Sequence, residues 1–234
     1  MLHYSDTTVF NVGAQVIANT VNCVGVMGNG LALECRLRYP AMFEDYVMRC
    51  KKGEVQIGKP YLYWEAPTLG ILNFPVKVHW KYPARLSWVE QSLQGFRQLL
   101  TETQISSVAF PLVGCHLGKL NPGDVQAMME RYLTDLPCTI YICFDREEYA
   151  SGVEGQMVAL LNEDDTWKQV LGLRQDMTDT IMNARPIKRI RDVRHIARVG
   201  KTMYERLHRW LYTRACGGET LVGKPLAEQQ SLLF

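Results

Sequence analysis

Across the first 145 residues, short runs rich in β-branched and aromatic residues alternate with longer segments whose apolar positions recur at helical spacing. This alternation predicts a layered α/β domain, in which strands build a sheet and helices cover its faces. The runs expected to form strands are Gln15–Thr20, Pro60–Glu65, Gly70–Phe74, Ser107–Pro111 and Thr139–Phe144.

The segments between these runs carry helix signals. Gly53 follows one periodic segment as a C-cap, while Asn121 and Pro122 give another an N-cap and a proline in its first turn. The expected helices are Leu31–Tyr39, Ala41–Lys52, Ala84–Thr101 and Asn121–Leu133.

The pattern changes after Asp145. Asp164–Arg214 has helical periodicity, with a break at Pro186 and no clear strand. We therefore expect an α/β domain over residues 1–150, a small basic helical module over 165–214 and a flexible tail over 215–234.

Charge is concentrated in the helical module. Residues 185–214 hold ten Lys or Arg against two acidic residues, a net charge of +8, which leaves −6 for the rest of a chain whose total is +2. Such asymmetry predicts a polyanionic partner. A solvated helix face is the alternative.

The composition, 47% hydrophobic and 21% charged, is that of an ordinary globular protein. We find no apolar run of about 18 residues that would predict a membrane span, and no basic and apolar stretch typical of a secretory signal. The seven cysteines lack C-x-x-C spacing, which indicates reduced thiols and no zinc site. We expect a cytoplasmic protein with no membrane partner, metal or cofactor.

A glycine-rich segment, Ala18–Ala32 (ANTVNCVGVMGNGLA), follows a predicted strand and opens a predicted helix. Gly25, Gly28 and Gly30 let the backbone approach a ligand closely, and the N–H groups of a helix N-terminus favour a phosphate. The spacing G-x-x-G-x-G differs from the dinucleotide fingerprint and from the triphosphate-binding loop. Considered alone, the segment indicates either an anion site or an ordinary turn.

A second such segment, Phe110–Leu120 (FPLVGCHLGKL), also follows a predicted strand and precedes a helix. Loops at adjoining strand ends of one sheet edge border a common crevice. Two backbone-lined anion sites in one crevice suit a diphosphate with a sugar at either end.

In this order and spacing, the segments NTVNxVGVMGxGLA, NFPxKxHW and PLxGCxxGxL resemble macro domains, and among these the DNA ADP-ribosyl glycohydrolases of the DarG antitoxin type. The resemblance covers roughly residues 5–145. It implies a three-layer α/β/α fold with a mixed sheet. The chain departs from the family at Thr7-Thr8-Val9, where G-D-[IL] is common, at Asn29, where Lys is frequent, and at His116, where Gly is common.

The resemblance also implies a position for ADP-ribose across the two glycine segments. Residues 25–31 would hold the distal ribose and the diphosphate, and Pro111–Gly118 would lie on the other side. The residues expected to contact ADP-ribose are Asn19, Thr20, Gly25, Val26, Met27, Gly28, Gly30, Leu31, Pro111, Leu112, Gly114, Cys115, His116, Leu117 and Gly118.

The candidate catalytic group lies in Ile71–Trp80 (ILNFPVKVHW), where we expect the strand to end at Pro75 and Lys77 to follow on a loop. In the glycohydrolases that this segment resembles, a Lys at this place acts on the anomeric carbon that carries the base. An amine of lowered pKa could form a Schiff base with the aldehyde of the opened sugar. As a cation it could instead stabilise charge on the leaving base. A solvated surface Lys is the simpler alternative.

Three further side chains accompany Lys77. Asn22 is the second catalytic candidate, expected to orient the distal ribose or the base; the alternative is that it satisfies the loop backbone. His79 and Trp80 are expected to stack on a flipped base or to hydrogen-bond to it. Trp80 could equally pack beneath the loop.

The basic segment Ile187–Tyr212 holds two helical patterns divided near Gly200, which is similar to a helix-turn-helix. The first keeps Ile190, Val193, Ile196 and Ala197 on one face, and the second keeps Met203, Leu207, Trp210 and Leu211 on one face. Docking on a toxin or another partner and simple packing are the alternatives to DNA binding. The candidate DNA contacts are Arg191, Arg194 and Arg198.

The last residues, EQQSLLF, resemble the peptide with which bacterial polymerases and repair proteins bind the sliding clamp. Such a peptide places apolar anchors in a groove. The expected anchors are Gln230, Leu232, Leu233 and Phe234.

Taken together, these features predict a macro-domain hydrolase that removes ADP-ribose from DNA bases. Its expected partners are ADP-ribose or ADP-ribosylated DNA, the sliding clamp and a cognate ADP-ribosyltransferase toxin. The alternatives are a non-catalytic ADP-ribose-binding module or antitoxin that acts by binding a partner, and an esterase that removes ADP-ribose from protein or a metabolite. Lys77 and the basic segment favour the hydrolase.

Overall fold

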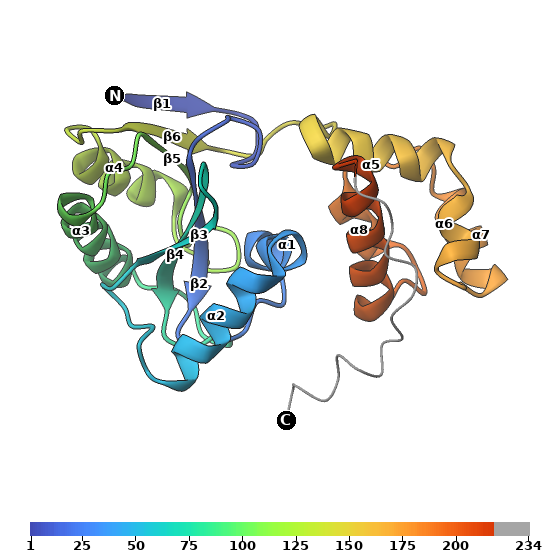
Figure 1. The fold of residues 1–234 in the computed structure, drawn as a ribbon, viewed down its shortest axis with the longest axis horizontal. Helices are drawn as coiled ribbons and strands as arrows, with labels where there is room; N and C mark the ends of the chain where they lie inside the picture. The colour runs from blue at the N-terminus through green and yellow to red at the C-terminus, as the bar shows by residue number, and fades with distance from the viewer. Residues whose placement is uncertain (218–234) are drawn as a thin grey trace. The chain divides into compact units, whose positions relative to one another are not determined.

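A computed structural model describes residues 1–217 and divides the chain into two compact units, Met1–Glu147 and a second that begins at Glu148. The first unit is built on a six-stranded sheet (Figure 1). In spatial order its strands are β1 (Leu2–Ser5), β6 (Thr139–Cys143), β5 (Ser107–Pro111), β2 (Val16–Asn22), β4 (Leu69–Lys77) and β3 (Tyr61–Ala66). Neighbouring strands are parallel, except that β3 is antiparallel to β4.

Helices cover both faces of this sheet. On one face lie α1 (Gly30–Arg38) and α2 (Pro40–Lys51), and on the other lie α3 (Leu86–Glu102) and α4 (Pro122–Leu133). Successive residues of a strand point to opposite faces. Leu72 therefore packs in the core with α3 and α4, whereas Ile71 packs in the core with α1 and α2. The three layers and the mixed sheet confirm the predicted fold class.

Strand β4 is longer than predicted. The sequence prediction ended it at Pro75 and put Lys77 on a loop; in the structure β4 continues to Lys77. A proline is tolerated in a strand where no ladder hydrogen bond is required from its nitrogen. Strand β3 pairs with β4 only as far as Asn73, so no ladder bond is needed from Pro75 on that side.

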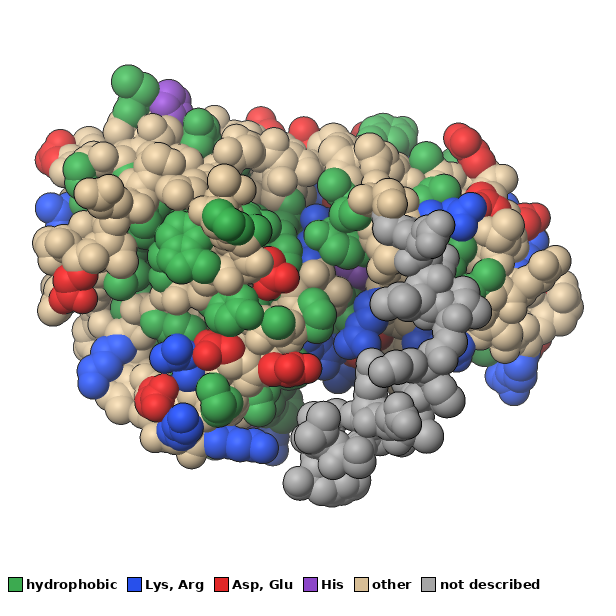
Figure 2. Space-filling view, viewed as in Figure 1, with side chains coloured by type: hydrophobic (Ala, Val, Ile, Leu, Met, Phe, Trp, Pro, Cys, Tyr) green, Lys and Arg blue, Asp and Glu red, His purple; other side chains and the backbone are tan. Residues whose placement is uncertain are grey.

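The prediction missed strand β1 entirely. It is a four-residue edge strand, and its residues, LHYS, are half-buried or exposed, so they lack the apolar run of a central strand. At the opposite edge, β3 has only half-buried and exposed positions, and Trp64 is 44% exposed. Hydrophobic side chains gather on the face of the first unit over which β3 runs (Figure 2).

The second unit is helical within the described residues. It contains α5 (Gly152–Glu163), α6 (Thr166–Val170), α7 (Gln175–Asn183), the 3-10 helix η1 (Ile190–His195) and α8 (Lys201–Ala215). The first of the two helices predicted around Gly200 is therefore wrong: a six-residue 3-10 turn replaces it. Ile190 and Val193 are buried, as the three-residue turn of a 3-10 helix requires, while Ala197 is exposed.

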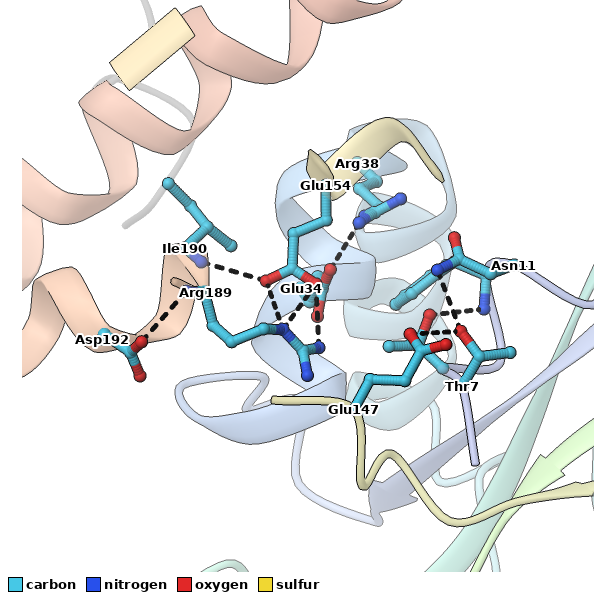
Figure 3. A network of polar contacts seen from close by, with 11 residues as sticks. Thr7, Asn11, Glu34, Arg38, Glu147, Glu154, Arg189, Ile190 and Asp192 are labelled. Carbon is cyan, nitrogen blue, oxygen red and sulfur yellow. Dashed lines mark hydrogen bonds and ion pairs between the residues drawn. The ribbon is translucent and has the colours of Figure 1, made fainter. Parts of the chain in front are cut away.

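A buried ion pair holds η1 against α5. Arg189 Nη2 lies 2.9 Å from Glu154 Oε2, and both side chains are about nine-tenths buried or more. Glu154 Oε1 also accepts the backbone N–H of Ile190 at 3.0 Å, and the Arg189 N–H donates to Asp192 at 3.0 Å (Figure 3). A buried carboxylate is tolerated when its oxygens are satisfied in this way.

No helix in residues 1–217 is long and apolar enough to cross a membrane. Within the same residues, no cluster of three or more His, Cys, Asp or Glu could hold a metal ion. The residues predicted to bind the sliding clamp, Gln230–Phe234, lie outside the described residues.

Candidate functional site

Three parallel neighbours, β4, β2 and β5, end at one edge of the sheet. Residues 23–29, here called loop one, follow β2, and residues 112–121, loop two, follow β5. Loop two closely approaches Gly30, the residue that follows loop one and begins α1: a Cβ on Gly30 would lie 3.2 Å from Leu117 Cδ1. The sheet thus brings the two glycine segments of the sequence together at one edge.

Loop one is organised by the side chain of Asn22, the last residue of β2. Asn22 Nδ2 donates to the carbonyl of Val26 at 2.6 Å, and Asn22 Oδ1 accepts the N–H of Val24 at 3.0 Å. The Tyr46 hydroxyl, from α2, donates to the backbone oxygen of Asn22 at 2.7 Å. Asn22 is only 8% exposed. This geometry favours the loop-supporting alternative for Asn22, so its catalytic assignment stays a prediction.

Beneath loop one lies a buried polar pair. Asn19 and Asn73 face each other in register on β2 and β4, and Asn19 Nδ2 donates to Asn73 Oδ1 at 3.0 Å. Met27 is 1% exposed, and its sulfur lies 3.7 Å from the same amide nitrogen. The side chains of Asn19 and Met27 therefore support the loop from below, and since both residues are fully buried, their contact with ADP-ribose stays a prediction.

After loop one comes the N-terminus of α1. Asn29 caps this helix, because its side chain accepts the N–H of Gly30 at 2.9 Å. The N–H groups of a helix's first turn have no acceptor within the helix, and together with the helix dipole they favour an anion. Gly30 has φ +56°, a backbone conformation that residues other than glycine rarely adopt.

Loop two is shaped by its own main chain. Leu120 N donates to Gly114 O at 3.1 Å, and Gly118 O accepts the N–H of Ala84 at 3.0 Å. A Cβ on Gly118 would lie 2.0 Å from Gly114 O, so this position has no room for any other residue. Gly114 itself has φ +75°.

Lys77 ends β4 beside these loops. A register shift after Val21 pairs Lys77 with Asn22, so the two catalytic candidates lie on adjacent strands. Lys77 Nζ donates a hydrogen bond to the carbonyl oxygen of Leu117 in loop two. Burial, and secondly the charge of Lys119, lower the pKa of Lys77. A lower pKa increases the fraction of uncharged amine, which is the form that can act as a nucleophile.

Aromatic side chains follow Lys77 on the surface. Trp80 is 50% exposed and stacks on His79, with ring centroids 5.6 Å apart and an interplanar angle of 25°. Tyr82 is 63% exposed, and its ring centroid lies 5.5 Å from that of His79. The alternative in which Trp80 packs beneath the loop disagrees with this exposure.

The other residues expected at the ligand differ in exposure. Val26, His116 and Leu117 are exposed. Cys115 is buried, and burial raises the pKa of its thiol to about 11, which leaves the thiol a poor nucleophile near neutral pH. Half-buried positions are Thr20, Gly25, Gly28, Leu31, Pro111 and Leu112.

Where many macro domains have Gly-Asp, this chain has Thr7-Thr8, and the Thr7 hydroxyl donates to Glu147 Oε2 at 2.8 Å (Figure 3). Asn11 Nδ2 donates to the same hydroxyl at 3.1 Å. Thr7 is thus engaged within the first unit. The neighbouring carboxylate, Asp6, is exposed and lies 3.7 Å from Arg146.

Sequence reasoning missed Tyr46, Asn73 and Lys119 as parts of this region. Tyr46 carried no signal, because it occupies one of several apolar positions on its helix. Asn73 had a weak signal: it is an amide within a buried strand, where a polar side chain needs a partner.

The candidate DNA contacts of the second unit are engaged in different ways. Arg198 is exposed and lies 3.3 Å from Asp176. Arg194 lies over the Tyr204 ring, with its guanidinium carbon 5.5 Å from the ring centroid. Arg191 is exposed. Their role in DNA binding stays a prediction.

Comparison with known proteins agrees with this geometry. Residues 18–129 match the macro domain family, and the macrodomain of Mycobacterium tuberculosis DarG has 35% identity and a TM-score of 0.59, covering 61% of this chain and 97% of that structure. The chain belongs to the macro domain family.

Among individual relatives, a DNA ADP-ribosyl glycohydrolase of Mycobacterium tuberculosis is 37% identical over 161 residues, which cover 66% of this chain and 46% of the relative. Thermosipho africanus DarTG, solved in complex with ADP-ribose, has 32% identity and a TM-score of 0.59, covering 66% of this chain and 44% of that one. The chain spans about half the length of the Mycobacterium relatives, since the match covers 46% of each.

Proposed function

We propose that this protein removes ADP-ribose from DNA bases by cleaving the bond between the base and the anomeric carbon of the distal ribose. The observation that carries the proposal is Lys77, a half-buried amine bound to the carbonyl of Leu117 in loop two, a residue whose side chain approaches Gly30 at the start of α1. Two relatives support it by name: the similar Mycobacterium tuberculosis protein is a DNA ADP-ribosyl glycohydrolase, and the Thermosipho africanus protein binds ADP-ribose.

The two loops have different roles in binding ADP-ribose. The N–H groups at the start of α1 and the backbone of loop two bind the diphosphate, because aligned N–H dipoles stabilise negative charge. The distal ribose then lies next to Lys77. Asn22 keeps loop one in the shape that this requires, and so acts as a positioning residue.

Lys77 acts as the nucleophile. Its neutral nitrogen bonds to the anomeric carbon while the bond from that carbon to the base nitrogen breaks. The base leaves with the bonding electron pair and takes a proton from water, and the Lys77 nitrogen releases a proton to solvent. Opening of the sugar ring yields a Schiff base, which water hydrolyses to free ADP-ribose and the amine.

The stacked pair of half-buried His79 and exposed Trp80 serves as a platform for the departing base. A base outside the duplex stacks on aromatic rings, typically for about 1–3 kcal/mol per base. Trp80 is half-exposed, follows Lys77 by three residues and has a cation, Lys81 Nζ, 5.3 Å from its ring centroid. A cation beside an aromatic ring suits the phosphates that accompany a base.

A cognate ADP-ribosyltransferase is the partner that this activity requires. The relative from Thermosipho africanus is a fusion of a DNA ADP-ribosyl transferase with a DNA ADP-ribosyl glycohydrolase. A transferase that modifies DNA supplies the substrate that this protein would clear.

The test compares the protein with Lys77→Met on an ADP-ribosylated single-stranded oligonucleotide. Release of ADP-ribose should fall by about 100-fold or more, since the substitution removes the nucleophile. Affinity for free ADP-ribose, measured by calorimetry, should stay within about tenfold, or 1.4 kcal/mol. Borohydride added during turnover should trap the protein as an adduct at Lys77.

Lys52→Met is the matched control, because Lys52 is exposed beyond the end of α2 and should leave release unchanged. Full turnover by Lys77→Met would reject the proposal. Release that depends on Lys77 but gives no trapped adduct would instead support electrostatic stabilisation of the leaving base.

A further inference from the structure

Lys119 has an unusual backbone for its residue type. Its φ is +62°, in the left-handed region that glycine and, less often, asparagine adopt. A left-handed conformation costs a non-glycine residue about 1 kcal/mol or more. A glycine at this position would avoid that cost, so the lysine side chain itself needs an explanation.

The backbone of Lys119 is tied on both sides. Its backbone nitrogen donates to the carbonyl oxygens of Cys115 at 3.1 Å and His116 at 3.3 Å. The backbone nitrogen of the next residue, Leu120, donates to the carbonyl oxygen of Gly114 at 3.1 Å. These bonds leave the main chain of Lys119 little freedom. Its side chain starts from a defined point and is itself exposed.

The turn that carries Lys119 also binds the side-chain nitrogen of Lys77. Lys77 Nζ binds the carbonyl of Leu117, two residues before Lys119 in the same turn. Lys77 ends β4 and binds this turn through its side chain, whereas Lys119 is part of the turn, so the two positive charges repel each other. The fixed backbone of Lys119 gives its charge a defined starting point near Lys77.

No carboxylate in the adjoining segments offsets this repulsion. Residues 19–33, 75–89 and 111–123, which supply β2 with loop one, the end of β4 with its continuation, and loop two, contain no Asp or Glu. The titratable side chains that these segments carry around Lys77 and Lys119 are Cys23, His79, Lys81, Tyr82, Arg85, Cys115 and His116. A site built in this way suits a diphosphate and disfavours a second positive charge.

We propose that Lys119 is a positioning residue that holds a positive charge beside Lys77 and thereby favours the uncharged form of its amine, which attacks the anomeric carbon. This inference rests on the proposed function. Lysine amines activated by an adjacent cationic group are an established device for nucleophilic catalysis.

The test uses two substitutions of one position. Lys119→Gly removes the charge and suits φ +62°, whereas Lys119→Arg keeps the charge. Because the uncharged amine is the reactive form, release of ADP-ribose rises with pH through the pKa of Lys77. Lys119→Gly should move this limb to higher pH and slow release about three- to tenfold at pH 7. Lys119→Arg should retain the parent profile.

A second measurement needs no activity. The side-chain resonance of Lys77, assigned by its absence in Lys77→Arg, is titrated by NMR in the parent and in Lys119→Gly. The midpoint should rise in Lys119→Gly. The difference should shrink in about 1 M salt, where the screening length falls to about 3 Å. Failure to act on ADP-ribosylated DNA would reject the proposed function and leave this titration to decide the role of Lys119.

An unchanged Lys77 titration in Lys119→Gly would overturn the inference. A drop of more than about tenfold in ADP-ribose affinity without any shift of the pH profile would also overturn it, because Lys119 would then be a phosphate ligand. Calorimetry with free ADP-ribose separates these outcomes.

Discussion

The two loops that border the candidate site are shaped by different means. Loop one takes its path from side chains: Asn22 binds the backbone at Val24 and Val26, and Tyr46 holds Asn22. Loop two takes its path from its main chain, where the carbonyl of Gly114 and the absence of a side chain at Gly118 define the turn. Loop one depends on the hydrogen-bonding amide of Asn22, and loop two depends on the absence of a side chain at Gly118.

This difference predicts how each loop tolerates change. A hydrogen-bond network loses its members one at a time, each for about 1–3 kcal/mol when a partner stays buried. A steric requirement has no intermediate state, because an added methyl group either fits or displaces the backbone. Substitutions in loop two should therefore act as a switch, and those around loop one should act in steps.

The largest effect is expected for Gly118→Ala. Its Cβ would lie 2.0 Å from Gly114 O and 2.6 Å from Gly114 C, so the turn must open. Calorimetry should record a loss of ADP-ribose affinity of about 100-fold or more, about 2.8 kcal/mol. Gly53→Ala is the control: Gly53 also lies in a turn, with φ +71°, but a Cβ there meets nothing within 4 Å. If Gly118→Ala binds like the parent, the steric account of loop two is wrong.

An intermediate effect is expected for Asn22→Ala. The substitution removes the acceptor of the Val24 N–H and the donor to Val26 O, so loop one loses its support. ADP-ribose affinity should fall about ten- to thirtyfold, and thermal unfolding should show a loss of about 1–3 kcal/mol. Tyr46→Phe, which leaves the amide in place, should have a smaller effect on both. Equal losses for the two variants would contradict a graded network.

The smallest effect is expected for Leu117→Ala, which weakens the contact between the loops. Leu117 is 52% exposed, and its Cδ1 would lie 3.2 Å from a Cβ on Gly30. Its truncation should lower ADP-ribose affinity about two- to threefold and leave the melting temperature unchanged, because little buried surface is lost. A large loss of stability would mean that the loops depend on each other for folding.

Much of the first unit was predictable, because its central strands are continuous apolar runs. Ile71–Phe74 is entirely buried, and such a run next to a helical period is read directly from the sequence. The glycine segments were found from the residues themselves, whereas Lys77 was assigned because its segment resembles that of the macro-domain glycohydrolases. The extension of β4 through Pro75 was not predictable, because it depends on where the neighbouring strand β3 stops.

The function of Asn22 illustrates a second limit. An asparagine before a glycine loop suits either a ligand or the loop backbone, and only the path of residues 24–26 distinguishes the two. In the second unit, Ile190 and Val193 are three residues apart, a spacing that fits both α and 3-10 geometry. The buried pair of Glu154 and Arg189 that stabilises η1 joins residues 35 positions apart, beyond the reach of a local pattern.

Because its own main chain holds loop two in shape, exposed side chains on this loop can be replaced without changing the turn. His116 is exposed, and main-chain hydrogen bonds hold the backbone of the turn that carries it. A substitution library at His116 could vary selectivity among ADP-ribose derivatives while the turn keeps its shape and Lys119 keeps its charge. A library in loop one would have to keep Asn22 and Tyr46 unchanged, because they hold the loop in shape. Loop two should therefore accept more sequence variation than loop one, both in evolution and in the laboratory.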